Sequence, residues 1–429
     1  MNSKLKYKLK TGDILYMVLF IPFFEPSYIG HNIPILHMIF RFGTYGAILF
    51  IGVLYISSLF RNKKKISTPV LFATVYSAII FISTVLNNGE IVSCLVEGLS
   101  LIALFMLSDS ICQKSVSRFL RIIYPIFYTF VVINFITMLI YPNGMYMYVM
   151  DGAYHWVSNF NWFLGLENAM IIYLLPTLVY TYIIYLQNNS KWNFFNCLLI
   201  SAICIYIPIV RWKAATMVCF ALFFIVVILS IWRLIPDLFN ARTYVILNIF
   251  FFVGLVLTGM KGGIVEGIVT YVAETILHKS DTLNVRMNIW GVVLNLIKEH
   301  PILGYGYEAT RIVTDKMKYN SPHNQYLWII YRGGLVQFTV FAWFLWKTAK
   351  SLFVRKEYLG VKIVSIGLCV SLLMWQTEAI TAYPIMIFLV FAFYFCDNRE
   401  YLAMLDKFAI KKIRITSKSR NNRVALRRE

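Results

Sequence analysis

Charged residues are scarce in this chain of 429 residues, of which only 14% are Asp, Glu, Lys or Arg while 59% are hydrophobic. With a mean hydropathy of +0.68, the chain has too little polar surface for a soluble protein of this length. Apolar runs of about 20 residues recur along it, which is the length at which a helix crosses a hydrocarbon core. Strands of a membrane barrel would alternate in shorter segments. The sequence therefore predicts an all-α, polytopic membrane protein.

Acidic residues are half as numerous as basic ones, 20 against 40, which gives a formal net charge of +20. Such an excess could indicate nucleic-acid binding, but the lysines and arginines lie in short links between apolar runs and at the two ends of the chain. Because Lys and Arg collect on the cytoplasmic side of membrane spans, this pattern reports topology. We expect cytoplasmic termini and no nucleic-acid partner.

Metal-binding and disulfide patterns are also missing. The seven cysteines have apolar neighbours and no C-x-x-C spacing, so they are expected to be small core residues without a disulfide framework. No H-E-x-x-H motif is present, and His31, His37, His155 and His278 lack the spacing of metal ligands. We therefore expect neither a metal site nor a cofactor.

The apolar runs predict about twelve transmembrane helices. The expected spans are Ile14–Ile29, Leu36–Phe60, Thr68–Leu86, Ile91–Leu107, Phe119–Tyr141, Phe163–Leu186, Phe194–Val210, Ala214–Ile235, Tyr244–Thr258, His323–Trp346, Ile363–Thr377 and Ala382–Phe395. With the amino terminus inside, the basic links fall mainly on the cytoplasmic side. The aromatic-rich segment Pro142–Trp162 then falls outside.

A large extracytoplasmic loop is expected before span ten. Apolar residues recur there at intervals of three and four in Ile264–His278 and Val285–His300, which indicates two amphipathic helices on the membrane surface. The expected organisation is an N-terminal membrane bundle of about nine spans over residues 1–258, the loop over 259–322, C-terminal spans over 323–396 and a basic cytoplasmic tail over 397–429.

Two arginines on the expected outer side are candidate anion-binding residues. Arg211 ends span seven, and Arg286 lies at the expected start of the second amphipathic helix. A guanidinium group holds phosphate by paired hydrogen bonds, and a helix N-terminus would add its own attraction for an anion. An interfacial anchor is the alternative for Arg211, and a solvated surface residue is the alternative for Arg286.

His323 is the candidate general base. It follows Ser321 and Pro322, which suit the N-cap and first position of a helix that begins span ten. Histidine side chains in general change charge near neutral pH, so a neutral imidazole at a helix start could accept a proton. The alternative is an interfacial histidine that bonds Asn324 or lipid headgroups. Weaker candidates for substrate contacts are Asn324, Tyr326, Asn168, Glu378 and Lys213.

Charged residues inside expected spans are costly unless they are paired or face a cavity. Glu25, Arg41 and Glu97 are of this kind, and an ion pair between Glu25 and Arg41 is the simplest expectation. The turn from His300 to Gly306 contains two glycines that would let the backbone turn sharply. It is no nucleotide-binding loop, because no strand precedes it.

Four short motifs lie between Arg286 and Leu335: R-x-x-x-W at Arg286, H-P-I-L-G-x-G from His300, H-N-x-Y-L from His323, and G-G-L ending at Leu335. Together they resemble the signature of bacterial O-antigen polymerases and ligases, the Wzy/WaaL family. The rest of the chain agrees in hydropathy, in the number of spans and in the position of the large outer loop.

The resemblance implies a GT-C-like, metal-independent glycosyltransferase of the bacterial cytoplasmic membrane that acts outside on undecaprenyl-diphosphate-linked glycans. By position, Arg211 and Arg286 would grip the donor diphosphate, and His323 would activate the acceptor hydroxyl. Two departures from the family pattern are the sequence R-W-K-A-A-T from Arg211 and the basic Arg332, where relatives often carry an acidic residue.

On this basis we expect a polymerase of capsule or O-antigen repeat units, with both termini cytoplasmic. Its partners would be the lipid-linked donor and acceptor glycans, membrane lipid, a chain-length regulator and a flippase. A ligase of the same family is the nearest alternative. A lipid-linked oligosaccharide flippase is a further alternative, although a transporter would show midplane polar sites and internal repeats.

Overall fold

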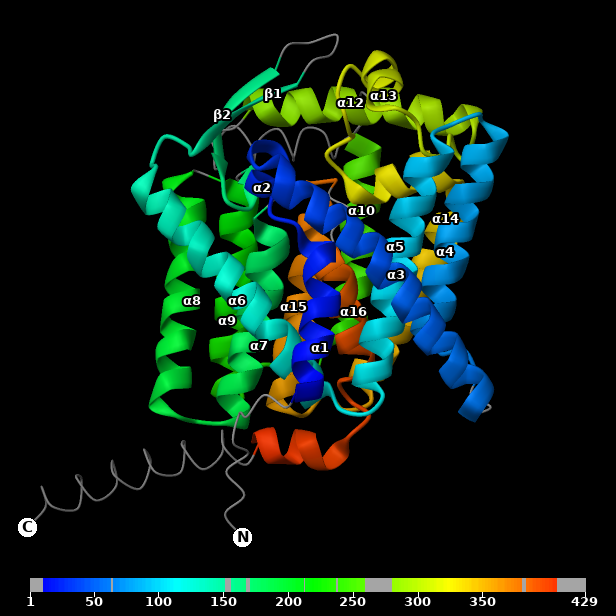
Figure 1. Ribbon diagram of the computed structural model, residues 1–429. Coiled ribbons are helices and arrows are strands. Elements are labelled where there is room, and N and C mark those ends of the chain that lie inside the picture. Colours follow the sequence, from blue (N-terminus) through cyan, green and yellow to red (C-terminus); the bar gives the residue numbers. More distant parts are fainter. Residues whose placement is uncertain are drawn as a thin grey trace, which may run out of the picture.

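The computed structural model describes residues 11–62, 65–150, 156–166, 170–211, 213–236, 238–258, 280–379 and 383–406. These residues form a polytopic membrane protein built from α-helices, as predicted. Figure 1 shows most helices running side by side, with α12 (Ser280–Glu299) lying across one end of the bundle. We call this end of the bundle the α12 end.

Each expected span, except the first, corresponds to one apolar helix. After the first, these are α3 (Pro34–Asn62), α4 (Thr68–Leu86), α5 (Ile91–Cys112), α6 (Val116–Ile140), α7 (Ile171–Gln187), α8 (Lys191–Val210), α9 (Ala214–Ile231), α10 (Ala241–Thr258), α14 (Gln325–Phe353), α15 (Leu359–Met374) and α16 (Tyr383–Tyr394). Six of these helices are long and apolar enough to cross a membrane by length and composition, and the others are shorter apolar helices.

The first span departs most from its expected range. Instead of one helix over Ile14–Ile29, the chain forms α1 (Thr11–Phe20), the 3-10 helix η1 (Ile21–Phe24) and α2 (Ser27–Asn32). The break falls at Glu25, whose ψ of 121° is extended. Proline at the next position disfavours the helical region for the residue before it, which explains the break.

The first and the last described residues of the chain lie at the same end of the bundle. Figure 1 shows the start of α1 and the helical turn over residues 399–406 at the end opposite α12. This arrangement agrees with an even number of crossings. The cytoplasmic location of that end remains a prediction from the basic links.

All seven cysteines are buried free thiols in the structure.

The segment after α6 contains a small sheet that the sequence did not reveal. Its strands β1 (Tyr146–Met150), β2 (Trp156–Trp162) and β3 (Gly165–Leu166) pair antiparallel in the order β1-β2-β3. Span six therefore begins at Ile171, in α7, and not at Phe163. Aromatic residues favour both membrane interfaces and strands, so composition alone did not separate the two.

Helices α12 and α13 (Thr310–Met317) dock on the first turns of α14 through a separate apolar cluster. Trp290 and Val293 of α12 are almost fully buried there, as are Met317 of α13 and Tyr331 of α14. Because helix α12 is fastened by this cluster, its side chains have fixed positions over the start of α14. The other expected amphipathic helix, Ile264–His278, lies outside the described residues.

The turn after α12 is locked into a kink of α14. At Gly334 the backbone has φ 66° and ψ −171°, which interrupts the helical hydrogen bonds. The carbonyls of Tyr331 and Arg332 accept hydrogen bonds from the N–H groups of Tyr305 and Gly306, both at 2.8 Å. Beyond the kink, Leu335 N–H donates to the Pro301 carbonyl at 2.9 Å and Val336 N–H donates to the Ile302 carbonyl at 3.3 Å.

Glycine is required at three positions of this lock. Gly304, Gly306 and Gly334 have φ of 66°, 78° and 66°, in the left-handed region that favours glycine. A Cβ on Gly304 would also overlap the Tyr331 carbonyl oxygen, and one on Gly334 would overlap that of Ile302. The expectation that glycines allow a sharp turn at 304 and 306 is confirmed, and the G-G pair of the later motif completes the same joint.

The expected ion pair between Glu25 and Arg41 is wrong. The Glu25 carboxylate lies 2.9 Å from His37 Nδ1, one helical turn before Arg41 on α3. Arg41 instead donates a hydrogen bond to the Tyr45 hydroxyl at 3.2 Å. The break between η1 and α2 places Glu25 beside the start of α3, which explains why the nearer His37 takes its carboxylate.

Candidate active site

Three of the predicted site residues meet at the α12 end of the bundle. Arg286 Nη2 lies 3.0 Å from Glu378 Oε1, and His323 Nδ1 lies 3.6 Å from Glu378 Oε2. The side chain of Glu378 is 10% exposed, whereas those of Arg286 and His323 are 24% and 35% exposed. A buried carboxylate thus stands between a guanidinium and an imidazole that both reach the surface. We call these three residues the Glu378 triad.

Arg286 reaches the triad from within α12 and not from its first turn. The helix was expected to start at Val285, but it begins at Ser280, so Arg286 lies nearly two turns inside it. The expected contribution of the helix N-terminus to anion binding at Arg286 is therefore wrong, because that effect falls off within the first turn. Its Nη2 donates to Glu378, and the other N–H groups of the guanidinium could donate to phosphate oxygens.

His323 lies just before α14, in a strained position of the backbone. Its φ of 48° is in the left-handed region, which is uncommon for residues other than glycine. The predicted N-cap at Ser321 is wrong, since α14 begins at Gln325 and Asn324 is its N-cap. Asn324 Oδ1 accepts hydrogen bonds from the N–H groups of Tyr326 and Leu327, and asparagine is among the strongest capping residues.

Three hydrogen bonds fix the segment that carries His323. Trp290 Nε1 donates to the carbonyl of Pro322 at 2.9 Å, which ties the segment to α12. Asn324 Nδ2 donates to the carbonyl of Gln376 at 3.0 Å, and Gln325 N–H donates to that of Trp375 at 2.7 Å. The last two bonds reach the segment that carries Glu378. The tryptophan of the R-x-x-x-W motif therefore positions the histidine of the H-N motif.

The geometry of the Glu378 triad suits proton transfer beside an anion. A carboxylate facing Nδ1 orients the imidazole and favours the tautomer in which Nε2 accepts a proton from a substrate. The distance of 3.6 Å to Nδ1 is longer than a hydrogen bond, which is common for catalytic contacts in structures without substrate. Arg286 on the other carboxylate oxygen supplies positive charge next to that base.

Arg211, the third predicted catalytic residue, is held by aromatic side chains. It is the C-cap of α8, and its guanidinium lies 4.0 Å from the ring centroid of Phe160 and 5.1 Å from that of Trp162. Both rings belong to β2. Arg211 is thus stacked on the small sheet, whereas Arg286 and His323 share Glu378. Stacking on two rings restricts the orientation of the guanidinium.

The weaker candidates have mixed outcomes. Asn324 is buried by its capping role, and the Tyr326 hydroxyl donates to the Leu372 carbonyl at 3.0 Å inside the protein, so both side chains have structural partners. Lys213 is the N-cap of α9, two residues after Arg211. Asn168 lies outside the described residues. Glu378 was expected only as a weak substrate contact. In the structure it is the residue that joins Arg286 and His323.

The predicted absence of a metal site remains a prediction. In the part of the chain that the structure describes, no group of three or more His, Cys, Asp or Glu residues is placed to hold a metal ion. The triad contains a single carboxylate and a single imidazole, so its donor set is poorer than that of common structural or catalytic zinc sites.

The sequence did not predict one ion pair near this end of the bundle. Arg332 of α14 contacts Glu97 of α5, with Nη1 to Oε1 at 3.1 Å and Nη2 to Oε2 at 3.5 Å. Each residue was noticeable alone, Glu97 as a charge in a span and Arg332 as a departure from the family pattern. Their separation of 235 residues left no local signal that they meet.

A comparison with curated proteins and one with solved structures each found no match to this chain. A family model described as O-antigen ligase (Wzy_C) matches residues 211–342. The matched range begins at Arg211 and includes Arg286, the glycine turn and His323, whereas Glu378 lies beyond it. The match confirms the resemblance drawn from the four motifs: over residues 211–342, this multi-pass membrane protein is similar to the O-antigen ligase family.

Proposed function

We propose that this protein is a glycosyltransferase that polymerises undecaprenyl-diphosphate-linked oligosaccharide repeat units on the outer face of the bacterial cytoplasmic membrane, for a capsule or an O-antigen. The family match supports an enzyme of the polymerase and ligase type. The observation that carries the proposal is the Glu378 triad, in which one carboxylate joins a candidate phosphate-binding arginine to a candidate base.

In the proposed reaction, a hydroxyl oxygen of the acceptor sugar attacks the anomeric carbon of the donor sugar. The bond between that carbon and the diphosphate oxygen breaks, and the leaving diphosphate takes the electron pair. The hydroxyl proton passes to His323 Nε2, while Glu378 faces Nδ1 and stabilises the imidazolium that forms. Arg286 binds the diphosphate as its negative charge increases.

The arrangement of Arg211 supports a second contact to the same diphosphate. Its guanidinium is stacked against β2, so it is pre-oriented, and less freedom is lost when it binds an anion. Two guanidinium groups on different elements would hold the two phosphates of a lipid diphosphate at once. The electrostatic term they supply in a site of low dielectric is commonly the largest in such transfers.

The ligase alternative uses the same donor and differs in the acceptor. Its chemistry at the triad would be identical, so the acceptor decides between the two. The flippase alternative needs polar sites at the membrane midplane. The triad instead lies at the α12 end, beside a helix that crosses the end of the bundle, which favours transfer over translocation (Figure 1).

The experiment uses the purified full-length protein in liposomes that contain lipid-linked repeat units of defined sugar. Glycans longer than one repeat, still attached to the lipid diphosphate, are the expected product. Repeat units transferred only to an added, different lipid acceptor would identify a ligase. Movement of intact lipid across the bilayer without new glycosidic bonds would overturn the proposal in favour of a transporter.

A further inference from the structure

A groove opens between α3 and α5, away from the Glu378 triad. It has a volume of about 410 Å³, within the range of small-ligand sites. Its walls are formed by η1, α3 and α5, and its inner end by Tyr307 and Tyr383. Polar and apolar side chains both line it; the polar members are Glu25, Arg41, Thr44, Tyr45, Ser93, Glu97 and Ser100, together with the two tyrosines. We call it the α3–α5 groove.

The outer wall of the groove faces lipid. In the apolar stretch of α3, only 11% of the residues are buried inside the protein. Phe42 is 70% exposed and Ile39 is 59% exposed, on either side of Arg41. Arg41 is the eighth residue of α3, which places it about 10 Å along the helix from its start. A ligand in the groove could therefore keep a hydrocarbon chain in the bilayer.

Arg41 brings a positive charge into this groove and forms no ion pair with Glu25 or Glu97, the two carboxylates that also line it. Among the described residues its hydrogen bond is with the Tyr45 hydroxyl, at 3.2 Å, and no ion pair is formed. The nearby Glu25 is taken by His37. A charged side chain in a membrane span normally pairs or marks a functional site. The groove therefore presents an exposed guanidinium to an anion, and lipids can supply that anion as a phosphate attached to a hydrocarbon chain.

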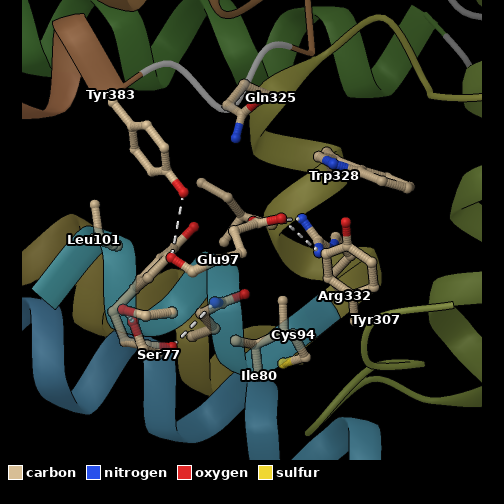
Figure 2. Close-up of a pocket in the computed structure, with 14 residues that line it drawn as sticks. Ser77, Ile80, Cys94, Glu97, Leu101, Tyr307, Gln325, Trp328, Arg332 and Tyr383 are labelled. Carbon is tan, nitrogen blue, oxygen red and sulfur yellow. Dashed lines mark hydrogen bonds and ion pairs between the residues drawn. The ribbon is translucent and has the colours of Figure 1, made fainter. Parts of the chain in front are cut away.

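The inner end of the groove is a fixed polar wall. Figure 2 shows Glu97 between Arg332 and Tyr383, where the Tyr383 hydroxyl donates to the Glu97 carbonyl at 3.4 Å. The Arg332 guanidinium lies 4.2 Å from the ring centroid of Tyr307 and 5.4 Å from that of Trp328. Because Glu97 already neutralises Arg332, Arg41 is the guanidinium in the groove that remains available to an anion. The Glu97 side chain is 30% exposed and can accept hydrogen bonds from sugar hydroxyls.

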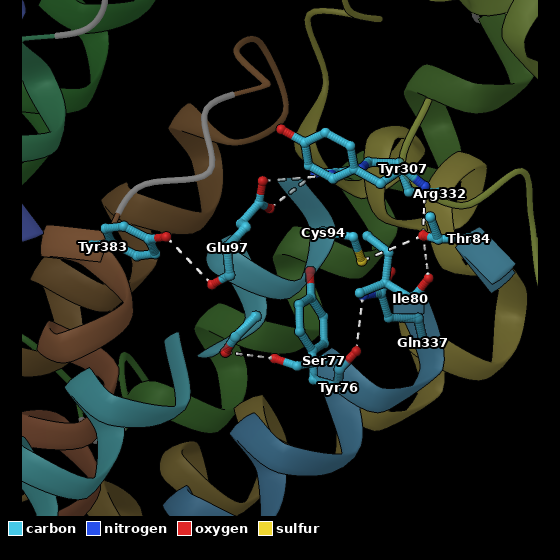
Figure 3. A network of polar contacts seen from close by, with 11 residues as sticks. Tyr76, Ser77, Ile80, Thr84, Cys94, Glu97, Tyr307, Arg332, Gln337 and Tyr383 are labelled. Carbon is cyan, nitrogen blue, oxygen red and sulfur yellow. Dashed lines mark hydrogen bonds and ion pairs between the residues drawn. The ribbon is translucent and has the colours of Figure 1, made fainter. Parts of the chain in front are cut away.

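This wall is joined to the glycine lock and so to the Glu378 triad. Behind Glu97, Tyr307 and Tyr383 lies a narrow cavity of about 20 Å³, with room for about one water. Figure 3 shows the network around it, in which Tyr307 N–H donates to Thr84 Oγ1 at 2.9 Å. Tyr307 follows Gly306 of the lock, and the cavity also touches Gln325, two residues after His323. The groove is thus closed at its inner end, and the small cavity behind that end touches α14, the helix that begins just after His323.

We propose that the α3–α5 groove binds the phosphate and first sugar of a second lipid-linked glycan, the acceptor. Arg41 binds the phosphate, Glu97 and the groove hydroxyls bind the sugar, and the lipid chain lies along α3. This inference rests on the proposed function for the role of acceptor. The lipid-phosphate site itself follows from Arg41, which forms no ion pair with Glu25 or Glu97, in a lipid-facing groove. A polymerase needs two such lipids at once, and the triad accounts for one.

The test measures lipid binding to the full-length protein in nanodiscs of zwitterionic phospholipid, with undecaprenyl diphosphate as the probe and native mass spectrometry as the readout. Wild-type protein should retain two molecules. Arg41→Gln should weaken one of the two sites at least 10-fold and leave the other unchanged. Arg61→Gln, at the opposite end of the same exposed helix, is the matched control and should retain both. Tyr45→Phe, which removes the partner of Arg41, should have a smaller effect in the same direction.

Competition separates the possible sources of the phosphate. Neither phosphatidylglycerol nor inorganic diphosphate should displace the Arg41-dependent molecule at comparable concentration. Equal displacement by phosphatidylglycerol would reduce the site to an ordinary headgroup contact and overturn the proposal, as would unchanged binding in Arg41→Gln. Displacement by inorganic diphosphate alone would contradict a lipid ligand.

A polymerisation assay separates this proposal from the proposed function. With active protein, Arg41→Gln should raise the KM for the acceptor at least 10-fold and leave kcat near that of the wild type. Active protein whose KM does not respond to Arg41→Gln contradicts the groove and leaves the polymerase intact. Inactive wild-type protein that still loses one lipid with Arg41→Gln contradicts the polymerase and supports the lipid-phosphate site.

Discussion

The guanidinium of Arg286 and the carboxylate of Glu378 form an ion pair at 3.0 Å across a separation of 92 residues in the chain. The first is on α12 and the second follows α15, two elements joined through the start of α14. The pair fixes where positive charge is available in the absence of substrate. It also leaves one carboxylate oxygen facing His323, so both functions of the site depend on a single side chain.

Replacing Glu378 by Gln should therefore weaken both functions. The amide cannot stabilise an imidazolium, and Arg286 loses its ion-pair partner, so we expect polymer formation to fall at least 10-fold, in line with the value of general-base groups. The rate of glycan extension in liposomes is the measurement. Glu357→Gln is the matched control, since Glu357 is exposed on the turn before α15, and it should leave the rate unchanged. Equal rates in both variants would contradict the role of Glu378.

Gly334→Ala should unfold the joint between the outer turn and α14. The added Cβ would overlap the Ile302 carbonyl, and the residue would be held at φ 66°. We expect a loss of roughly 2 kcal/mol or more in stability, from strain and lost hydrogen bonds. Gly46→Ala is the control, because nothing lies within 4 Å of its Cβ position in α3, and it should be neutral or slightly stabilising. Thermal denaturation in detergent compares the two, and similar melting temperatures would contradict the lock.

Asp406 predicts a pH dependence of stability. Its carboxylate accepts the Leu359 N–H at 2.8 Å at the start of α15, and burial raises its pKa above the ordinary 3.8 despite that bond. A carboxyl group whose folded pKa is raised stabilises the fold while protonated, and this contribution is lost as pH rises through the raised value. Asp406→Asn keeps an oxygen acceptor without the charge.

We therefore expect Asp406→Asn to denature at a higher temperature than the wild type at pH 7, with the difference shrinking as the pH falls toward 4. Asp406→Ala, which removes the acceptor, should cost about 1 kcal/mol at either pH. Melting curves at several pH values provide the check. An advantage of the Asn variant that stays constant with pH would rule out the titration of this carboxyl group as its cause.

The helices followed from the sequence because a hydrocarbon core demands about 20 apolar residues in each span. For α4 both ends were predicted at Thr68 and Leu86, where Ser67 caps the helix and accepts a hydrogen bond from Val70 N–H. The first span failed at Glu25 because the proline after it acts locally within an apolar run that hydropathy treats as uniform.

The site was predicted in its parts and not in its connections. Arg286 and His323 carry motif residues and a chemistry that can be recognised in isolation. That Glu378 joins them, and that Glu97 meets Arg332, depends on how α5, α12, α14 and α15 pack. Pairings across 92 and 235 residues leave no periodicity to detect, so only the folded arrangement reveals them.

The role of His323 is tested most directly by the length of the glycans that purified His323→Ala synthesises in liposomes with lipid-linked repeat units. His323 is positioned by hydrogen bonds of its neighbours, at the Pro322 carbonyl and the Asn324 side chain, so the variant should fold and stay in the membrane. Loss of the base should slow extension by about 10²- to 10⁴-fold, which leaves single repeat units on the lipid. Chains of wild-type length from the folded variant would contradict the assignment of His323 as the base.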